Sequence, residues 1–547
     1  MTASNPGPIS APASGPICVA VPPGPPRRVD VAVVGSGAAG LVAACRAADG
    51  GRSVVVLEKA DLLGGTSAIS GGVAWMPNHH LMGPEFPDSA PAALTYLTAA
   101  TGGTVPADVL RWYIETAGQA VRWLDEHTRV RLTALPRPDY HTEWAGAARG
   151  RGLDNLPFDG TAHPGLTARI RPPTYFPSLT MTERDAMAAS GFDAELIARR
   201  DADGTRTMGG ALIAALLVSA ADRGVEVLAG CGVDDLRRTA DGWDLTTGQG
   251  PVSAGAVVLA TGGFEWNPRL QQAFLPNPVT PISAPGNTGD GLELGLAAGG
   301  AVDVMRAVWG VPVLQDPAHV YDGRPSGRMA NVELTLPGSI MVNAAGRRFV
   351  NEAVNYHDLN KVFRTIDPTT GAHANIPAWL IVDSGYVERY SIGGTPAGRV
   401  PDWAVSGSTV EELAQALGID PFALAQTVTE FNKDAADGRD PLFHRGESAA
   451  DRYLGDPRRP HPCLAPLADG PFHAVPIRPG TLGTCGGLVT DEAGRVLDRR
   501  GEPVGGLYAA GNVAATVFAD AYPGGGATLG SAITRAYAVG RALAGTR

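Results

Sequence analysis

The sequence predicts an α/β protein in which both ends of the chain build one doubly wound, Rossmann-like nucleotide-binding domain around an inserted second domain. Three observations predict this class. A strand–glycine loop–helix–strand unit occupies residues 29–59, and two further buried strands end in glycines at residues 255–263 and 505–512. The chain has 547 residues, which is more than one hydrophobic core accommodates.

Composition and charge exclude several classes of function. A net charge of −11 argues against a nucleic-acid partner. The longest apolar stretch, residues 209–221, is shorter than the roughly 20 residues that span a bilayer, so we expect no transmembrane segment. The five cysteines contain no CxxC pair, which argues against a zinc or redox site of that type and fits reduced thiols in the cytoplasm. We expect no metal.

Residues 29–59 carry the dinucleotide-binding pattern. The buried strand "VDVAVV" is followed by "GSGAAG", which has the G-x-G-x-x-G spacing, and then by a helix. The first glycine permits the tight turn, the second lets a diphosphate approach the backbone, and the third allows close helix–strand packing. The helix N-terminus stabilises the phosphate charge. The expected phosphate contacts are Gly35, Ser36, Gly37, Ala38, Ala39 and Gly40.

The second strand of this unit ends in Glu58, whose carboxylate can accept hydrogen bonds from ribose hydroxyls. Further segments, rich in glycine and hydroxyl groups, resemble the FAD-contacting elements of flavoproteins with two dinucleotide folds. The resemblance implies non-covalent FAD. The expected contacts beyond the phosphate loop are Glu58, Lys59, Gly65, Thr66, Ser67, Ser70, Gly71, Gly72, Val233, Thr261, Gly262, Gly511, Asn512, Ala527, Thr528 and Leu529.

The motifs "GGTSAISGG", "LATGGF", "NTGDGLELGLAAGG", "GRRFVNE" and "YPGGG" together resemble the fumarate reductase/3-ketosteroid dehydrogenase flavoprotein family. The resemblance extends over nearly all of residues 29–547. It implies a doubly wound FAD domain that carries an inserted α+β cap, which is the catalytic domain.

The expected boundaries follow from this resemblance and from composition. We place the FAD domain at 29–305 and 471–547 and the cap at 306–470, with a proline-rich, disordered leader at 1–28. We expect residues 80–200 to form a largely helical excursion over the flavin. The cap segment 339–352 predicts a hairpin with its turn at 343–346.

Three tyrosines favour the ketosteroid branch of this family. Tyr522 and Gly526 resemble the family's "YPGxG" segment, Tyr356 follows its "NE" signature, and Tyr140 lies in "RPDYHTE". The resemblance implies that the Tyr522 hydroxyl and the Gly526 amide hold a substrate ketone oxygen, that Tyr356 removes a proton, and that Tyr140 assists Tyr356. His141 and His357 adjoin two of these tyrosines and are more typical of satisfied structural histidines.

Dehydrogenation of a saturated carbon pair requires such groups. One carbon must lose a proton, and the developing enolate oxygen needs hydrogen-bond donors. An ordinary tyrosine, with a pKa of about 10, is a weak base and needs help from a neighbour. We therefore predict that a small hydrophobic cyclic ketone or steroid loses two hydrogens beside its ketone, and that an external acceptor takes the electrons.

Two alternatives stay open. A fumarate- or enoate-type reductase would run the reaction in the opposite direction and would need an arginine proton donor, whereas a non-catalytic electron carrier would need no oxygen-polarising group. Arg347 and Arg348 discriminate little, because the family's motif carries arginine in both branches. Ser531 stands where ketosteroid enzymes usually carry proline, and residues 155–200 match no family segment.

Overall fold

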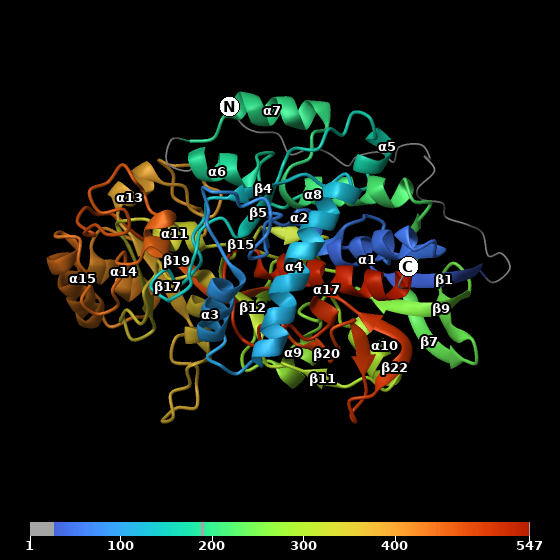
Figure 1. Ribbon diagram of the computed structural model, residues 1–547. Coiled ribbons are helices and arrows are strands. Elements are labelled where there is room, and N and C mark those ends of the chain that lie inside the picture. Colours follow the sequence, from blue (N-terminus) through green and yellow to red (C-terminus); the bar gives the residue numbers. More distant parts are fainter. Residues whose placement is uncertain (1–26, 188–190, 546–547) are drawn as a thin grey trace.

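The computed structural model describes residues 27–187 and 191–545. The predicted leader at 1–28 therefore lies outside the described residues, except for Arg27 and Arg28 at the start of the first strand. Two mixed sheets dominate the structure (Figure 1): one lies in the region of β1 and β9, and the other, on the opposite side of the view, carries α13, α14 and α15. The predicted fold class, an α/β FAD-type domain with an α+β cap, is confirmed.

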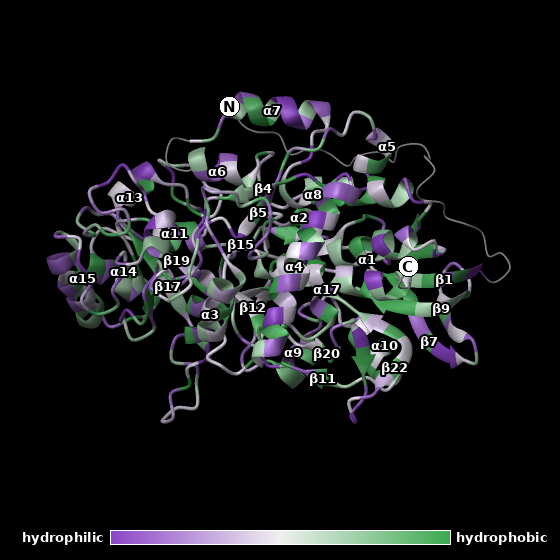
Figure 2. Ribbon diagram, viewed as in Figure 1, coloured by the Kyte–Doolittle hydropathy of each residue, from purple (hydrophilic) through white to green (hydrophobic). Residues whose placement is uncertain are grey.

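The first sheet has eight strands and joins both ends of the chain. Its parallel core runs in the order β22 (Pro503–Ala509), β9 (Val252–Leu259), β1 (Arg27–Val34), β2 (Val54–Leu57), β6 (Glu226–Leu228). Three antiparallel strands complete it: β21 (Arg495–Leu497), β7 (Val233–Thr239) and β8 (Gly242–Thr247). In Figure 2, β9 is mostly hydrophobic and β7 mostly hydrophilic, as expected for a central strand and a solvated edge.

Helices cover this sheet because alternate side chains of β1 enter two different cores. Val31 and Val33 pack in a core with the principal helices, whereas Ala32 and Val34 pack in a core with the β7–β8 side. The helices of this unit are α1 (Ala38–Asp49), α2 (Gly65–Ile69), α8 (Met208–Ala221), α9 (Pro268–Phe274), α10 (Asp290–Ala297) and α17 (Ala527–Ala544). Helix α17, at the C-terminal end, packs directly against α1.

The excursion between α2 and α8 is helical with one small sheet. Its elements are β3 (Ala74–Trp75), α3 (Ala90–Ala100), α4 (Ala107–His127), β4 (Leu132–Leu135), β5 (Gly152–Asn155), α5 (Pro164–Thr167), α6 (Met181–Met187) and α7 (Ala194–Asp203). None of α7 is buried, and it lies at the edge of the molecule in Figure 1. Within the described ranges, no helix combines the length and apolar character needed to cross a membrane.

The cap is built on a seven-stranded sheet. Its strands are β10 (Thr280–Pro281), β12 (Val308–Leu314), β15 (Arg328–Met329), β16 (Ser339–Asn343), β17 (Ala378–Val382), β18 (Val405–Gly407) and β19 (Phe472–Thr484). Its helices are α11 (Asn331–Thr335), α12 (Tyr356–Lys361), α13 (Ser384–Arg389), α14 (Val410–Leu417), α15 (Pro421–Ala435) and α16 (Ala449–Tyr453). The domain boundaries stay a prediction, and the pairing of β19 with β12 and β17 favours a second boundary after residue 484.

Short strand pairs complete the chain: β11 (Val302–Asp303) pairs with β20 (Gly487–Leu488), and β13 (Val320–Tyr321) pairs with β14 (Arg324–Pro325). The hairpin expected at 339–352 forms only in part. Strand β16 and the turn after it are present, but the returning arm makes a single bridge, from Val342 to Arg348. The arm leaves the sheet because the Arg348 side chain enters a buried ionic cluster.

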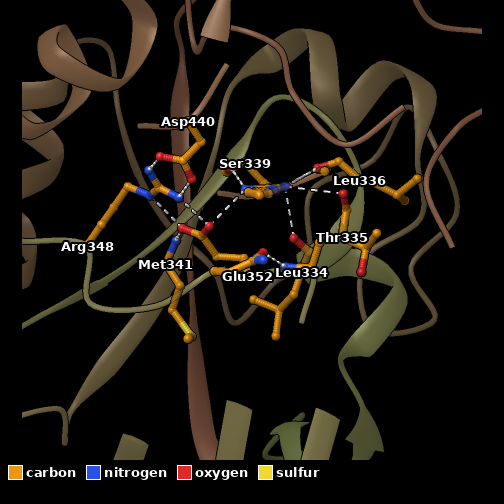
Figure 3. Close-up of polar contacts among 12 residues, drawn as sticks. Leu334, Thr335, Leu336, Ser339, Met341, Arg348, Glu352 and Asp440 are labelled. Atoms are coloured by element: carbon orange, nitrogen blue, oxygen red, sulfur yellow. Dashed lines mark hydrogen bonds and ion pairs between the residues drawn. The ribbon is translucent and has the colours of Figure 1, made fainter. Parts of the chain in front are cut away.

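This ionic cluster, shown in Figure 3, explains the "RRFVNE" motif. Arg348 donates to both oxygens of Glu352, at 2.8 and 2.6 Å, and to both oxygens of Asp440, at 3.0 and 2.7 Å. Arg445 also reaches Glu352, at 3.2 Å, and donates to the carbonyl oxygen of Ser339, at 2.7 Å. Arg348 therefore stabilises the cap and is not available to bind a substrate carboxylate.

Candidate active site

A cavity of about 1060 Å³ lies between the two sheets. Of the residues expected to contact FAD, all except Gly40 and Ala527 line it. Both exceptions are fully buried beside the lining. Tyr356, Tyr522 and Gly526 also line the cavity, whereas Tyr140 lies behind them.

The glycine loop has the geometry that a dinucleotide phosphate requires. Gly35 has φ 107°, and a Cβ there would collide with the carbonyl oxygen of Ala260. A Cβ on Gly40 would collide with the carbonyl oxygen of Gly35, so Gly40 serves the packing of α1 under the loop. Gly37 is open toward the cavity, since the nearest atom to its Cβ position is Ser67 Oγ at 3.6 Å. These features fit a phosphate held at the N-terminus of α1.

Glu58 is held in place by its own neighbours. One carboxylate oxygen accepts hydrogen bonds from the Ser36 amide at 2.9 Å and the Ser36 hydroxyl at 2.7 Å, and the other accepts from the Ala60 amide at 3.0 Å. A carboxylate offers about four acceptor positions, so this side chain can still accept from a ribose. Lys59 is engaged elsewhere, with its ammonium 2.7 Å from Thr288 Oγ1 and 2.6 Å from Asp290.

The middle of the cavity offers backbone and hydroxyl groups. Thr66 Oγ1 accepts hydrogen bonds from the Ala284 amide at 3.1 Å and the Asn287 side chain at 3.0 Å. Thr261, which follows β9, has a buried hydroxyl with no hydrogen-bond partner among the described residues. An extended cofactor with polar groups along its length fits this cavity, and an unpartnered buried hydroxyl is the kind of group that such a ligand satisfies.

The loop before α17 brings the opposite chain ends together. Gly526 is the N-cap of α17 with φ 96°, and a Cβ there would collide with the Val73 carbonyl. The Gly526 carbonyl accepts from the Trp75 amide at 3.0 Å, and the Pro523 carbonyl accepts from the Tyr140 amide at 3.2 Å. These bonds fix the loop against β3 and the segment after β4.

The three predicted tyrosines meet at one place although they come from three distant segments. The ring centroids of Tyr140 and Tyr356 are 5.4 Å apart, those of Tyr140 and Tyr522 5.8 Å, and those of Tyr356 and Tyr522 5.4 Å. Burial raises the pKa of Tyr522, although the backbone N–H groups of Gly526 and Thr528 and the Thr528 hydroxyl, 3.3 Å away, oppose this shift. The Gly526 amide at the start of α17 therefore points toward the Tyr522 phenol oxygen.

The pKa of Tyr356 is raised more strongly than that of Tyr522. Burial raises the pKa of its phenol well above the ordinary value, and the neighbouring phenols Tyr140 and Tyr522 raise it further. Burial likewise raises the pKa of Tyr140 well above its ordinary value, and the positive charge of Arg137 opposes this rise only in part. A Cβ on Gly525 would lie 3.3 Å from the Tyr140 hydroxyl and 3.7 Å from Arg137 Nη1, so these two groups face the same glycine.

The two histidines beside the tyrosines hold segments together. His141 Nε2 lies 2.8 Å from an Asp358 oxygen, which links the Tyr140 segment to α12. His357 Nδ1 accepts from the Gly310 amide at 3.3 Å, and its Nε2 lies 3.2 Å from the Asp520 carbonyl, two residues before Tyr522. Burial lowers the pKa of His357 to about 4, so this imidazole stays neutral and is not a proton source at neutral pH.

Sequence reasoning missed the cavity wall formed by residues 174–186. Tyr175, Phe176, Arg184 and Asp185 line the cavity from this wall, together with Arg137 from the segment after β4. Arg137 makes two parallel hydrogen bonds to Asp185, each 2.6 Å long, and the Tyr453 hydroxyl donates to the same carboxylate at 2.9 Å. The signal for Arg137 was its place three residues before Tyr140 in "RPDYH". The wall itself carried no recognisable pattern.

Comparison with known proteins identifies the group to which this chain is related. Residues 30–529 match the family described as FAD binding domain. The 4-oxocyclohexanecarboxylate 2-dehydrogenase of Sinomonas cyclohexanicum is 39% identical, over 95% of this chain and 94% of that protein. The 3-oxosteroid 1-dehydrogenase of Mycolicibacterium smegmatis is 35% identical, over 95% of this chain and 98% of that protein.

A solved structure shows the same likeness in three dimensions. The 3-ketosteroid Δ1-dehydrogenase of Sterolibacterium denitrificans, solved with 1,4-androstadiene-3,17-dione, superposes with a TM-score of 0.87 at 34% identity. The match covers 95% of this chain and 99% of that chain. The chain therefore belongs to the FAD binding domain family and is an FAD-dependent oxidoreductase acting on CH–CH bonds.

Proposed function

We propose that this protein introduces a carbon–carbon double bond next to a ring ketone, as the names of its relatives describe for 4-oxocyclohexanecarboxylate and 3-oxosteroids. One observation carries the proposal: the phenols of Tyr356 and Tyr522, with Tyr140 packed behind them, and the backbone amide of Gly526 gather beside the part of the cavity that fits the flavin. FAD, when bound, supplies the acceptor for the hydride that leaves the substrate.

The ketone oxygen binds between Tyr522 and Gly526. The Gly526 amide lies beside the Tyr522 hydroxyl, and Gly526 has no side chain that would block a ketone from approaching both. Two donors aimed at a carbonyl oxygen stabilise the negative charge that develops there when the adjacent carbon loses a proton. This pair makes that carbon acidic enough for a weak base to act.

Tyr356 removes the proton. Its phenol lines the cavity beside Tyr522. The high pKa of Tyr356 in the buried site makes its anion strongly basic, and the anion needs stabilisation while it exists. We assign this task to Tyr140, which shares a hydrogen bond with Tyr356 and can donate its own hydroxyl to the anion once Tyr356 has lost its proton. Arg137 adds a positive charge beside Tyr140.

The reductase alternative is less well supported by the arginines. Arg137 lies close to the tyrosines, but its Nε and Nη2 groups donate to Asp185. Burial alone would lower the pKa of Arg137, but the hydrogen bonds and the charge of Asp185 more than offset this and raise the net pKa, which makes Arg137 a poor proton donor. An electron carrier would not need the hydrogen-bond donors Tyr522 and Gly526. Dehydrogenation uses these donors as well as the tyrosine base.

The test uses the purified holoprotein with androstenedione, cyclohexanone and 4-oxocyclohexanecarboxylate, each with an artificial electron acceptor. The expected product of at least one ketone is lighter by two hydrogen atoms. Absence of such a product from every ketone overturns the proposal, and reoxidation of the dye-reduced flavin by fumarate identifies a reductase. Release of yellow FAD on denaturation checks that the cofactor is bound non-covalently.

A further inference from the structure

The wall at residues 174–186 contacts Gly71, in the segment expected to run along the flavin. A Cβ on Gly71 would collide with the end of the Met181 side chain and lie 3.7 Å from the Phe176 ring. Gly71 is one of the glycines expected to run along the cofactor. Arg184, three residues after Met181 on α6, lines the same cavity. The wall therefore brings a guanidinium close to the reactive end of the cavity.

Arg184 lacks a carboxylate of its own among the described residues. Its Nη1 lies 3.6 Å from an Asp185 oxygen, which is beyond hydrogen-bond distance. Both Asp185 oxygens already accept hydrogen bonds from Arg137, and one also accepts from Tyr453. Asp185 thus lies near two guanidinium groups but accepts hydrogen bonds only from that of Arg137. The positive charge of Arg184 therefore has no hydrogen-bonded carboxylate among the described residues.

The surroundings of Arg184 make its positive charge unfavourable. The Arg184 side chain is only 22% exposed, and burial followed by repulsion from Arg137 lowers its pKa. Glu333 lies near enough to interact, but burial raises the pKa of this carboxyl, which reduces its value as a counter-ion. A buried cation without a paired anion is unfavourable, so an anionic ligand at this position would be strongly stabilised.

Two other cavity arginines have carboxylate partners: Arg171 pairs with Asp322 at 2.5 Å, and Arg458 pairs with Asp456 at 2.9 Å. Arg328 and Arg389 also line the cavity, and neither makes a carboxylate hydrogen bond within residues 27–187 and 191–545. Arg184 differs from these two because it lies beside the Arg137–Asp185 ion pair, which faces Gly525 next to the tyrosines.

We infer that Arg184 binds a carboxylate group of the substrate, so that the substrate is a carboxylate-bearing ring ketone and not a neutral steroid. The inference rests on the proposed function, because Tyr522 and Gly526 would hold the ketone at the other side of the ring. Contacts run from Gly525, beside the tyrosines, through Arg137 and Asp185 to Arg184. They connect the position expected for the ketone with the position proposed for the carboxylate. A planar guanidinium fork matches a carboxylate in two hydrogen bonds.

The test compares a carboxylate with its neutral isostere. Holoprotein is assayed with 4-oxocyclohexanecarboxylate and with 4-oxocyclohexanecarboxamide. We expect kcat/KM to favour the carboxylate by about 10- to 100-fold, the range of one charged hydrogen-bonded contact. Arg184→Met should reduce this preference to nearly one and leave carboxamide turnover in place. Arg184→Lys should retain part of it.

Arg199→Met is the matched control, since Arg199 lies exposed on α7 and its loss changes the net charge equally. Equal use of both ketones by the wild type, or a preference that survives Arg184→Met, overturns the carboxylate site and leaves the dehydrogenase standing.

A binding measurement keeps this test separate from the chemistry. Cyclohexanecarboxylate has no ketone and cannot react by the proposed route. Calorimetry should show that Arg184→Met weakens its binding by about 10- to 100-fold, while cyclohexanecarboxamide is unaffected. An unchanged Kd for the carboxylate overturns the inference even if no ketone is turned over.

Discussion

The rings of Tyr356 and Tyr522 lie edge to face at 64°, with their centroids 5.4 Å apart, although the two residues are 166 positions apart in the sequence. Tyr356 begins α12 in the cap, and Tyr522 precedes α17, which packs on the nucleotide-binding sheet. The contact therefore joins the two units at the point where a ketone would meet the flavin. A base and an oxyanion donor are needed side by side for α-proton removal.

Tyr522→Phe should remove one of the two donors to the ketone oxygen while leaving the ring packing intact. We expect kcat to fall by about 100- to 1000-fold, the usual effect of losing one oxyanion donor. Steady-state assays with a turned-over ring ketone measure the loss, and the flavin absorbance of the purified variant should match the wild type. Near-normal turnover with bound FAD would refute the role of this hydroxyl.

The pH dependence of the reaction should report Tyr356. Burial raises the pKa of this phenol well above its ordinary value, so the basic form becomes more abundant as the pH rises. We expect kcat/KM to rise by about tenfold per pH unit without a plateau below pH of about 10. Tyr356→Phe should abolish this rise. A plateau near neutral pH that persists in Tyr356→Phe would assign the base to another residue.

Tyr140→Phe should have a smaller effect than either of the other two substitutions. Tyr140 does not line the cavity and acts through Tyr356. The loss of one hydrogen bond predicts a decrease in kcat of about tenfold, measured in the same steady-state assay. An unaltered kcat would show that Tyr140 only packs against its neighbours.

Glu58→Gln should weaken FAD binding. The carboxylate accepts three hydrogen bonds from Ser36 and Ala60, and an amide offers a donor where one of these requires an acceptor. We expect the Kd for FAD to increase by about tenfold, measured by titrating the apoprotein and following flavin fluorescence. The exposed Glu85→Gln substitution is the control. Equal FAD affinity in both variants would exclude Glu58 from the site.

Glu352→Gln should destabilise the cap. Burial alone would raise the pKa of Glu352, but Arg348 and Arg445 more than offset this, and the net pKa is lowered. A lowered pKa in the folded state gives stability that is present above the unfolded pKa of about 4.3 and is lost as the pH falls through the folded pKa. Removing the charge leaves two buried guanidinium groups underpaired.

The expected cost of Glu352→Gln is about 3–5 kcal/mol in the free energy of unfolding, measured by chemical denaturation of the holoprotein at neutral pH. Glu388→Gln, at an exposed position on α13 in the same cap, is the matched control. A loss no larger than that of the control would show that the cluster contributes little to stability.

Local features of this chain were predictable because their physical cause is local. The glycine loop at Gly35–Gly40 and the acid at Glu58 follow from strand, turn and helix within 31 residues (59 − 29 + 1), and the structure places them along one cavity. The placement of residues 505–512 in the same domain as the N-terminal strands followed from the resemblance of glycine-rich segments at both chain ends to the FAD-contacting elements of flavoproteins. The meeting of the three tyrosines was inferred only from the family motif, because nothing in their spacing brings them together.

Long-range ionic partners were not predictable. Arg348 follows a turn and resembled a possible carboxylate ligand, yet its partner Asp440 lies 92 residues away. The wall at residues 174–186 has neither periodicity nor a motif, so its cavity-lining Arg184 emerged only from the tertiary structure. Likewise, β19 joins the cap sheet because its pairing partners β12 and β17 lie far upstream.

The most direct measurement of the central claim is the mass of the product formed from a ring ketone by the holoprotein and by Tyr522→Phe. With 4-oxocyclohexanecarboxylate or a 3-oxosteroid and an artificial electron acceptor, the account predicts that the wild type forms a product lighter by two hydrogen atoms. It also predicts that Tyr522→Phe, with FAD bound, forms about 100- to 1000-fold less per unit time. A holoprotein that leaves every ring ketone unchanged, or a Tyr522→Phe variant as fast as the wild type, would contradict it.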